Sequence, residues 1–201
     1  MTATAMINCR KIDCGDRAFY RMALGLGGPV EIAEDLAVLV DFRSPADALS
    51  DCQRAARCVN LPMTGVGERY RNTRLPTAED LLGFYRELLD TYRDGFAQVA
   101  RLAAAEELIG FGCYFGKDRT GIATFLLGLR FGLPIGRVVE DYCESGVQLR
   151  RSIDAMPDHW TKRGLTREAY ADRLQCRPET ILGLHDYLRS RYGSVRDYLD
   201  C

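Results

Sequence analysis

The sequence predicts an α/β protein in which helices flank a central, mostly parallel sheet. Short apolar runs alternate along the chain with longer segments whose apolar residues recur every three or four positions. The first pattern is typical of buried parallel strands, and the second of helices that cover a sheet. The chain has 201 residues, and one hydrophobic core can extend to roughly 250 residues. We therefore predict a single domain over residues 1–201.

The strand candidates are short runs that end at polar or proline residues. Residues 37–42, AVLVDF, form the clearest run, because it is continuously apolar up to Asp41. The candidates cover residues 6–12, 18–22, 37–42, 57–62 and 107–113, of which the first two are the weakest. We expect these runs to form the sheet, with helices on both of its faces.

Helical spacing dominates from residue 77 onward. Thr77 and Asp80 have the spacing of a capping box, and leucine and tyrosine residues then recur at helical intervals through about residue 105. Pro134 suits the first turn of a helix, and Gly193 is expected to break the last helix before a short final turn. The predicted helices cover residues 77–105, 119–132, roughly 134–150 and 165–199.

Charge and hydropathy exclude several functional classes. The net charge of −1 gives no electrostatic reason to bind nucleic acid or an anionic membrane. The first 20 residues carry several charges and no apolar core, so no secretory signal is visible. No stretch reaches the ~20 apolar residues of a membrane span. We expect a cytoplasmic protein without a nucleic-acid partner or a membrane anchor, and the oligomeric state stays open.

The eight cysteines do not have the spacing of a metal site or a disulfide framework. The chain lacks the closely spaced cysteine pairs of zinc sites, and its only histidines are His159 and His185. Without an export signal, structural disulfides are not expected. We therefore predict that most of these cysteines are reduced thiols and that the protein uses no metal and no other cofactor.

Residues 113–121, CYFGKDRTG, combine residue types that core packing does not require. Cys113 ends a predicted strand and Arg119 begins a predicted helix, the place where ligands bind in open α/β sheets. A helix N-terminus attracts anions, Gly116 allows the loop amides to point inward, and an arginine fork matches phosphate. The same surroundings stabilise a thiolate at Cys113, to which the Thr120 hydroxyl can donate a hydrogen bond. The loop therefore predicts a nucleophile beneath a phosphate pocket, the alternative being a glycine-rich turn with an incidental cysteine.

The loop resembles the C-x5-R signature of cysteine-dependent phosphatases, and most closely the bacterial tyrosine and lipid phosphatases that carry HCxxGKDRTG. Gly112 occupies the position of the usual histidine, and the usual N-F-R-D opening is represented only by residues 7–17. Further similar segments are VDFRSPAD at 40–47, EDYCES at 140–145 and RYGSVRDYL at 191–199. The resemblance extends over about residues 6–199 and implies a fold like that of protein-tyrosine and dual-specificity phosphatases.

The resemblance implies a phosphoric monoester hydrolase that forms a phosphocysteine. Cys113 is then the nucleophile, Arg119 stabilises the transferring phosphoryl group, and Asp118 protonates the leaving oxygen. Asp118 could instead only offset the helix dipole, in which case Asp41 and Asp80 are the other candidate acids. The further residues expected to bind phosphate or substrate are Tyr114, Phe115, Gly116, Lys117, Thr120 and Arg43.

Several other residues have two interpretations. Arg43 could instead be a structural partner of Asp47 or of the signature loop. Asp141 and Ser145 could face the site or serve packing, and His159 is expected at an ordinary surface or interface. The basic and aromatic segment 63–76 is expected to be flexible, either as a lid over the substrate or as a solvated loop.

The substrate predicted from the sequence is a small soluble phosphate, such as a nucleotide or a sugar phosphate. A small phosphate needs only a cleft that can close, and the basic segment and Lys117 suit a small polyanion. Phosphotyrosine on a protein and a phosphoinositide are the alternatives. Because Gly112 replaces the usual histidine, a catalytically impaired phosphate-binding module is a further alternative.

Overall fold

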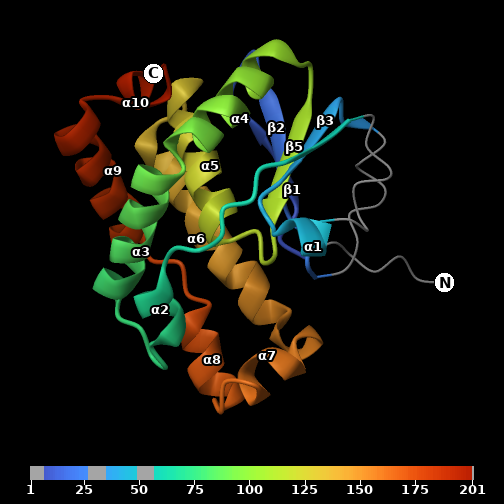
Figure 1. Cartoon of the computed structure of the whole chain (residues 1–201), viewed down its shortest axis with the longest axis vertical. Coiled ribbons are helices and arrows are strands. Elements are labelled where there is room, and N and C mark those ends of the chain that lie inside the picture. Colours follow the sequence, from blue (N-terminus) through green and yellow to red (C-terminus); the bar gives the residue numbers. More distant parts are fainter. Residues whose placement is uncertain (1–6, 27–34, 49–56, 201) are drawn as a thin grey trace.

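A computed structural model describes residues 7–26, 35–48 and 57–200 of the chain. In this part of the chain, five strands form one sheet in the order β1-β2-β5-β3-β4 (Figure 1). β1 and β2 are antiparallel, whereas β2, β5, β3 and β4 run parallel to one another, which confirms the predicted mostly parallel sheet. The strands are β1 (Arg10–Asp13), β2 (Ala18–Ala23), β3 (Val38–Asp41), β4 (Cys58–Asn60) and β5 (Ile109–Cys113).

The central strand β5 has two chemically different faces. Ile109, Phe111 and Cys113 belong to the large core cluster, which also includes side chains of the helices. Gly110 and Gly112 alternate with them and therefore face the other side of the sheet. There Met22, Leu24, Leu36 and Leu39 form a small separate cluster.

The helices pack against the sheet and against one another. α5 is the central helix, because its side chains from Thr120 to Gly128 are buried and it packs against β5, α4 and α6. The principal helices are α3 (Ala78–Thr91), α4 (Arg93–Ala105), α5 (Asp118–Arg130), α6 (Ile135–Arg151) and α9 (Pro178–Tyr192). The shorter ones are α1 (Pro45–Ala48), α2 (Glu68–Asn72), α7 (Pro157–Thr161), α8 (Arg167–Arg173) and α10 (Val195–Leu199). None of the helices in the described ranges is both long enough and apolar enough to cross a bilayer.

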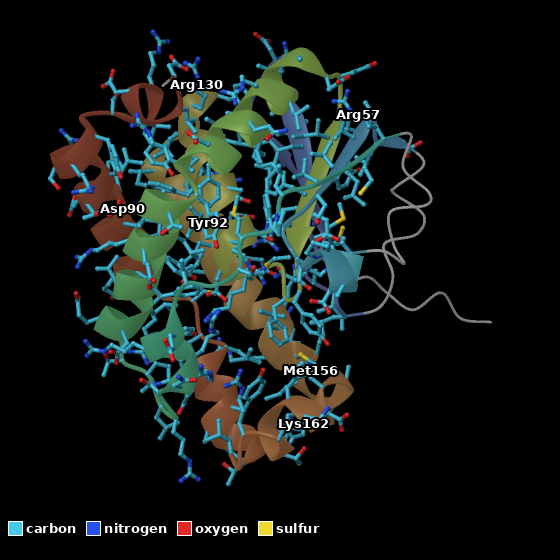
Figure 2. All side chains as sticks on the ribbon, in the orientation of Figure 1. Arg57, Asp90, Tyr92, Arg130, Met156 and Lys162 are labelled. Carbon is cyan, nitrogen blue, oxygen red and sulfur yellow. The ribbon has the colours of Figure 1, made fainter. Side chains whose placement is uncertain are left out.

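The predicted helix starting at Thr77 begins as expected but ends early. The Thr77 hydroxyl accepts from the Asp80 amide at 3.1 Å, and the Asp80 carboxylate accepts from the Thr77 amide at 3.0 Å. The helix does not continue to residue 105, since Tyr92 separates α3 from α4. The Tyr92 hydroxyl (labelled in Figure 2) donates to the carbonyl of Thr64, and Arg93 donates to the carbonyl of Tyr198. These contacts reach distant segments, so helical periodicity does not reveal them.

Smaller corrections concern a proline, the C-terminal region and the cysteines. Pro134 is the N-cap of α6 rather than a residue of its first turn. The predicted helix 165–199 consists of α8, α9 and α10, and Gly193, with φ 84°, separates the last two as expected. Cys58 is disulfide-bonded, whereas the other five described cysteines are free, in line with the expectation that most are reduced. The free thiols in the described ranges are Cys9, Cys14, Cys113, Cys143 and Cys176.

Candidate active site

The two parallel neighbours of β5 hold Cys113 at the carboxyl end of the sheet. The backbone amide of Leu24 donates to the carbonyl of Cys113 at 2.8 Å, and that of Phe42 donates to the carbonyl of Gly112 at 2.9 Å. The Cys113 side chain is buried, and α5 begins five residues later. The thiol therefore lies at the fixed edge of a sheet, just before a helix N-terminus.

Thr120 in the first turn of α5 contacts this thiol. Its hydroxyl donates to the Cys113 sulfur at 3.1 Å, and both side chains are buried. The sequence predicted this bond. Thr120 therefore links the first turn of α5 directly to the Cys113 sulfur.

The signature loop is tied to the rest of the protein through its carbonyl groups. The Asn8 side-chain amide donates to the carbonyls of Phe115 and Gly116, each at 2.9 Å, and Arg21 also donates to the Gly116 carbonyl. Gly116 has φ 62°, and a Cβ there would lie 2.7 Å from the carbonyl oxygen of Met22. Only glycine fits this position, and its backbone lets the loop amides point away from the tied carbonyls.

A buried ionic cluster holds those ties in place. The Asp141 carboxylate pairs with Arg10 at 2.7 Å and with Arg21, which is fully buried. Arg10 also donates to the side-chain oxygens of Asn8 at 2.7 Å and of Ser145 at 3.0 Å. Asp141 and Ser145 thus stabilise the loop indirectly, through the side chains that bind its carbonyls.

Sequence reasoning did not identify the functional importance of Asn8, Arg10 and Arg21. Asn8 and Arg10 lie in the segment that resembles the family's N-x-R opening, so that resemblance could have pointed to them. Arg21 stands in the predicted strand 18–22, where an arginine on the core side requires a buried partner. The need for a buried partner could therefore have identified Arg21 from the sequence.

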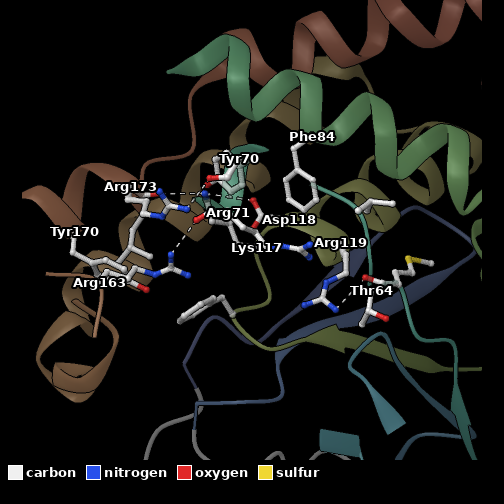
Figure 3. Close-up of a pocket in the computed structure, with 14 residues that line it drawn as sticks. Thr64, Tyr70, Arg71, Phe84, Lys117, Asp118, Arg119, Arg163, Tyr170 and Arg173 are labelled. Carbon is white, nitrogen blue, oxygen red and sulfur yellow. Dashed lines mark hydrogen bonds and ion pairs between the residues drawn. The ribbon is translucent and has the colours of Figure 1, made fainter. Parts of the chain in front are cut away.

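Arg119 extends from α5 toward the segments that follow β3 and β4. Its guanidinium donates to the carbonyl of Phe42 at 2.7 Å and contacts the carbonyl of Met63 at 3.5 Å. The same guanidinium lines the cavity above the loop (Figure 3). The cation predicted to bind phosphate is therefore placed by backbone carbonyls and faces the cavity.

Asp118 accepts a hydrogen bond that the sequence did not predict. The Tyr85 hydroxyl of α3 donates to its carboxylate at 2.7 Å and lies 2.9 Å from the Tyr142 hydroxyl. Burial, followed by the charge of Asp118, raises the pKa of Tyr85 well above its usual value. Tyr85 therefore keeps its proton at neutral pH and fixes the orientation of the Asp118 carboxylate.

Lys117 lies beside Asp118 but is more deeply buried than expected. Its ammonium group lies 3.4 Å from the Asp118 carboxylate and donates to the Arg173 carbonyl at 3.3 Å. Burial, the largest single effect, would lower the pKa of Lys117, but the Asp118 carboxylate acts together with Tyr70, Cys176 and Tyr142 and raises it well above the ordinary value. Lys117 is thus a permanent cation in the wall of the cavity.

Arg43 has a partner other than the one expected. Its guanidinium pairs with Asp41 at 2.8 Å and donates to the Leu24 carbonyl at 2.8 Å, so Asp47 is not its partner. Asp47 instead accepts from Ser44 at 2.6 Å. Asp41 is fully buried in this pair and does not line the cavity, and Asp80 is occupied as a helix cap. Of the three candidate acids, Asp118 is the one at the cavity.

The cavity above the loop has a volume of about 220 Å³ (Figure 3). Of the predicted site residues, Phe115, Lys117, Asp118 and Arg119 line it, whereas Cys113 and Thr120 lie buried beneath the loop. Figure 3 shows Phe84 on one side of the cavity, and Arg119 on the side opposite Arg163 and Arg173. The sequence did not predict that α3 and residues 163–174 also line the cavity.

Segment 63–76 lines the cavity with several of its residues and includes a short helix. It contains α2, and Tyr70 of this helix stacks on Phe84 with ring centroids 5.1 Å apart. The Arg173 guanidinium lies 4.9 Å from the Tyr70 ring centre and donates to the Thr73 carbonyl at 2.7 Å. The segment is thus held against the cavity by contacts with α3 and with α8.

His159 and Tyr114 join α7 to the signature loop. The Tyr114 hydroxyl lies 3.3 Å from a His159 ring nitrogen, and the His159 ring also packs on Phe115 at 5.1 Å. Burial, followed by the charges of Arg163 and Lys162, lowers the pKa of His159. The histidine is therefore part of the loop's support rather than an ordinary surface residue.

The strand geometry explains the glycine at position 112. A Cβ at Gly112 would lie 2.6 Å both from the carbonyl oxygen of Met22 and from a side-chain carbon of Leu24. A histidine therefore has no space here, and the Phe42 amide holds the Gly112 carbonyl instead. The described residues also contain no cluster of three or more His, Cys, Asp or Glu side chains that could hold a metal ion.

Comparisons with known proteins agree with the resemblance of the signature loop. A curated Cupriavidus necator protein, named provisionally as a tyrosine-protein phosphatase, is 26% identical over 119 residues, or 59% of this chain. The match covers 44% of that relative, so the chain spans less than half of its length. Residues 33–201 match the tyrosine phosphatase family.

Two solved structures of Pseudomonas aeruginosa TpbA are also similar to this chain. TpbA itself is 16% identical with a TM-score of 0.38, over 90% of this chain and 91% of TpbA. A TpbA variant in complex with pTyr is 16% identical with a TM-score of 0.34, over 87% of this chain and 98% of that one. Because the family match extends over most of its residues, this chain belongs to the tyrosine phosphatase family.

Proposed function

We propose that this protein hydrolyses phosphomonoesters with Cys113 as the nucleophile. The observation that carries the proposal is the bond of 3.1 Å from Thr120 to the Cys113 sulfur, beneath a loop whose carbonyls are tied back. Family membership supports the same chemistry. The preserved combination of Cys113, Asp118 and Arg119 favours catalysis over a module that only binds phosphate.

The reaction has two steps in this proposal. The Cys113 thiolate sulfur bonds to phosphorus while the bond to the leaving oxygen breaks, and Asp118, in its protonated form, gives its proton to that oxygen and becomes a carboxylate. Water then attacks phosphorus, Asp118 takes up the proton of water, and the sulfur–phosphorus bond breaks to restore the thiolate. The loop amides and Arg119 stabilise the charge on the non-bridging phosphoryl oxygens in both steps.

We infer that the substrate is a small soluble phosphate, such as a nucleotide or a sugar phosphate. The cavity of about 220 Å³ and its walls from several segments suit a ligand of this size. A phosphotyrosine peptide and a phosphoinositide are the competing substrates. The comparison to make is kcat/KM for phosphotyrosine peptides against nucleotide and sugar phosphates, and a preference of about a hundredfold for the peptides, about 2.7 kcal/mol, would reverse this assignment.

The test of the function is a panel of phosphomonoesters with Cys113→Ser as the blank. We expect the parent protein to hydrolyse at least one member, and Cys113→Ser and Arg119→Ala to lose activity by at least about a thousandfold. Added EDTA is expected to leave the rate unchanged. Undiminished activity of Cys113→Ser, or a rate abolished by EDTA and restored by metal, would falsify the proposal.

A further inference from the structure

We propose that Arg71 and Arg163 form a second anion subsite in the cavity, besides the signature loop. The preferred substrates then carry a second anionic group, a phosphate in the simplest case, besides the phosphate that is hydrolysed. This inference rests on the proposed phosphatase function and adds the substrate class. It assigns a role to two residues that lie outside the signature loop.

The charges of the cavity are strongly unbalanced. Its lining includes five cationic side chains and one carboxylate, although the whole chain has a net charge of −1. A cleft lined by one sign of charge concentrates ligands of the other sign. The charged lining residues are Arg71, Lys117, Arg119, Arg163, Arg173 and Asp118.

Three of these cations have other roles. Lys117 is buried against the Asp118 carboxylate, and Arg119 belongs to the signature loop. Arg173 donates to the carbonyls of Tyr70 at 3.1 Å and Thr73 at 2.7 Å, and so holds the wall of the cavity. The remaining two cations, Arg71 and Arg163, form no ion pair among the described residues, and the guanidinium of Arg163 makes one contact, to a backbone carbonyl.

Arg71 and Arg163 meet from two separate elements. Both are exposed, and Arg163 donates to the backbone carbonyl of Arg71 at 3.3 Å, which keeps the two residues adjacent. Among the described residues, no ion pair includes Arg71 or Arg163, whereas the nearby Arg69 and Lys162 pair with Asp80 and Asp158.

The positive charge of Arg163 lowers the pKa values of neighbouring groups. The charge of Arg163 adds to burial in lowering the pKa values of His159 and Arg173. Like charges that lie close together repel one another, and an anion bound between them reduces that repulsion. Guanidinium forks match the oxygens of a phosphate in pairs, so a phosphate is the ligand that suits them best.

The test compares substrates that differ by one phosphate. Fructose 1,6-bisphosphate and fructose 6-phosphate are assayed with the parent protein and with Arg71→Gln/Arg163→Gln. We expect the parent protein to prefer the bisphosphate in kcat/KM by at least about tenfold, the gain of a charged bidentate contact, and the double variant to lose most of that ratio. Arg71→Lys/Arg163→Lys, which keeps the charges, is expected to recover part of it.

The matched control is Arg69→Gln/Lys162→Gln. It removes two charges from positions one and two residues away from the proposed subsite residues, on side chains that do not line the cavity. We expect this control to keep the parent's ratio. A ratio that is the same in the parent, the control and the Gln double variant, or that falls equally in both variants, overturns the subsite.

A lipid headgroup offers the same chemistry as a free bisphosphate, so the assay has a second arm. It uses phosphatidylinositol 4,5-bisphosphate against phosphatidylinositol 4-phosphate in phosphatidylcholine vesicles. If Arg71→Gln/Arg163→Gln loses the preference for the bisphosphate only with vesicles, the subsite binds a lipid headgroup. If it loses that preference with the sugar phosphates, the subsite binds a soluble ligand. No loss in either arm rejects the subsite.

A binding measurement separates this inference from the proposed function. Calorimetry with Cys113→Ser measures the Kd of the bisphosphate and the monophosphate without turnover. If the parent protein hydrolyses no phosphomonoester, the proposed function fails, but the subsite stands where the bisphosphate binds at least about tenfold more tightly. Equal affinities, or a preference that survives Arg71→Gln/Arg163→Gln, reject the subsite.

Discussion

Tyr85 and Asp118 are separated by 33 residues in sequence, yet the tyrosine hydroxyl determines how the carboxylate faces the cavity. The bond of 2.7 Å, backed by Tyr142, restricts the proposed general acid to one orientation. A carboxylate that gives a proton to a leaving oxygen has to be held within hydrogen-bond reach of it. At the residue scale, Tyr85 is therefore a positioning residue of the proposed reaction.

The first prediction is that Tyr85→Phe lowers kcat for alkyl phosphates with little change in KM. A lost hydrogen bond to a carboxylate is worth about 1.5 kcal/mol, or about tenfold in rate. Aryl phosphates with acidic leaving groups need less proton donation and are expected to slow down less. Tyr187→Phe is the control, since Tyr187 makes a bond of 2.7 Å to Asp90 outside the cavity. Equal slowing of both substrate classes would make Tyr85 merely structural.

The second prediction concerns Gly112. Gly112→Ala is expected to destabilise the protein by about 1–3 kcal/mol, because its Cβ would press on Met22 and Leu24. Gly112→His should destabilise it more and should not raise activity. Gly83→Ala in α3, where no atom lies within 4 Å of an added Cβ, is the control and is expected to stabilise by up to about 1 kcal/mol. Urea denaturation measures the three values, and a neutral Gly112→Ala contradicts the argument.

At the element scale, three separate segments hold the signature loop. β1 and β2 supply Arg10 and Arg21, α6 supplies Asp141, and Asn8 links them to the loop carbonyls. A buried charge that loses its partner is strongly destabilising, whereas the loss of a neutral hydrogen bond is not. The stability of the loop therefore depends on the Asp141 charge more than on any single neutral contact.

The third prediction follows from this dependence. Asp141→Asn leaves Arg10 and Arg21 without a carboxylate and is expected to cost about 3 kcal/mol of folding free energy and to lower kcat. Ser145→Ala loses one bond to Arg10 and is expected to cost about 1 kcal/mol. Urea denaturation and steady-state kinetics of both variants make the comparison. Equal losses in the two variants would show that the Asp141 charge has no special role.

The contact between α7 and the loop predicts a pH effect. The pKa of His159 is lower in the folded than in the unfolded protein, so the unfolded state binds a proton first as pH falls. This contribution to stability is present above the ordinary histidine pKa of about 6.5 and is lost below it. The fourth prediction is that His159→Gln loses less stability than the parent between about pH 7.5 and pH 5, measured by urea denaturation. An identical loss in the two proteins would remove His159 as a cause.

At the scale of the whole molecule, a chain with almost no net charge places five cationic side chains around one cavity. The lining cations come from α2, the signature loop and residues 163–173, which are distant in sequence. Salt screens such a field, because the Debye length is about 10 Å at about 0.1 M ionic strength. The electrostatic attraction of the substrate should therefore depend on salt, although the net charge of −1 does not suggest it.

The fifth prediction uses this salt dependence. Raising NaCl from about 20 mM to about 200 mM is expected to raise KM for anionic substrates several-fold and to leave kcat nearly constant. The effect should be greater for a bisphosphate than for a monophosphate. Steady-state kinetics over this range, with a potassium fluoride series as a check on chloride binding, measures it. A KM that is independent of salt would mean that the cavity's charges do not attract the substrate.

The sequence by itself determined the parts of the protein that depend on neighbouring residues. β5, the signature loop and α5 are consecutive, so the strand run, Gly116 and the helix start could be read together, and the predicted bond from Thr120 to Cys113 is present. The capping box at Thr77 is equally local. Backbone hydrogen bonding and side-chain periodicity act over a few residues, which is why these features were predictable.

Only the tertiary structure decided which distant side chains complete the site. Asn8 reaches across 107 residues to the Phe115 carbonyl, and Arg10 across 131 residues to Asp141. The helix break at Tyr92, the pairing of Arg43 with Asp41, and the meeting of Arg71 with Arg163 likewise depend on how packed elements approach one another. Such contacts produce no periodic pattern in the sequence, because the two partners are distant along the chain and become neighbours only when the elements pack together.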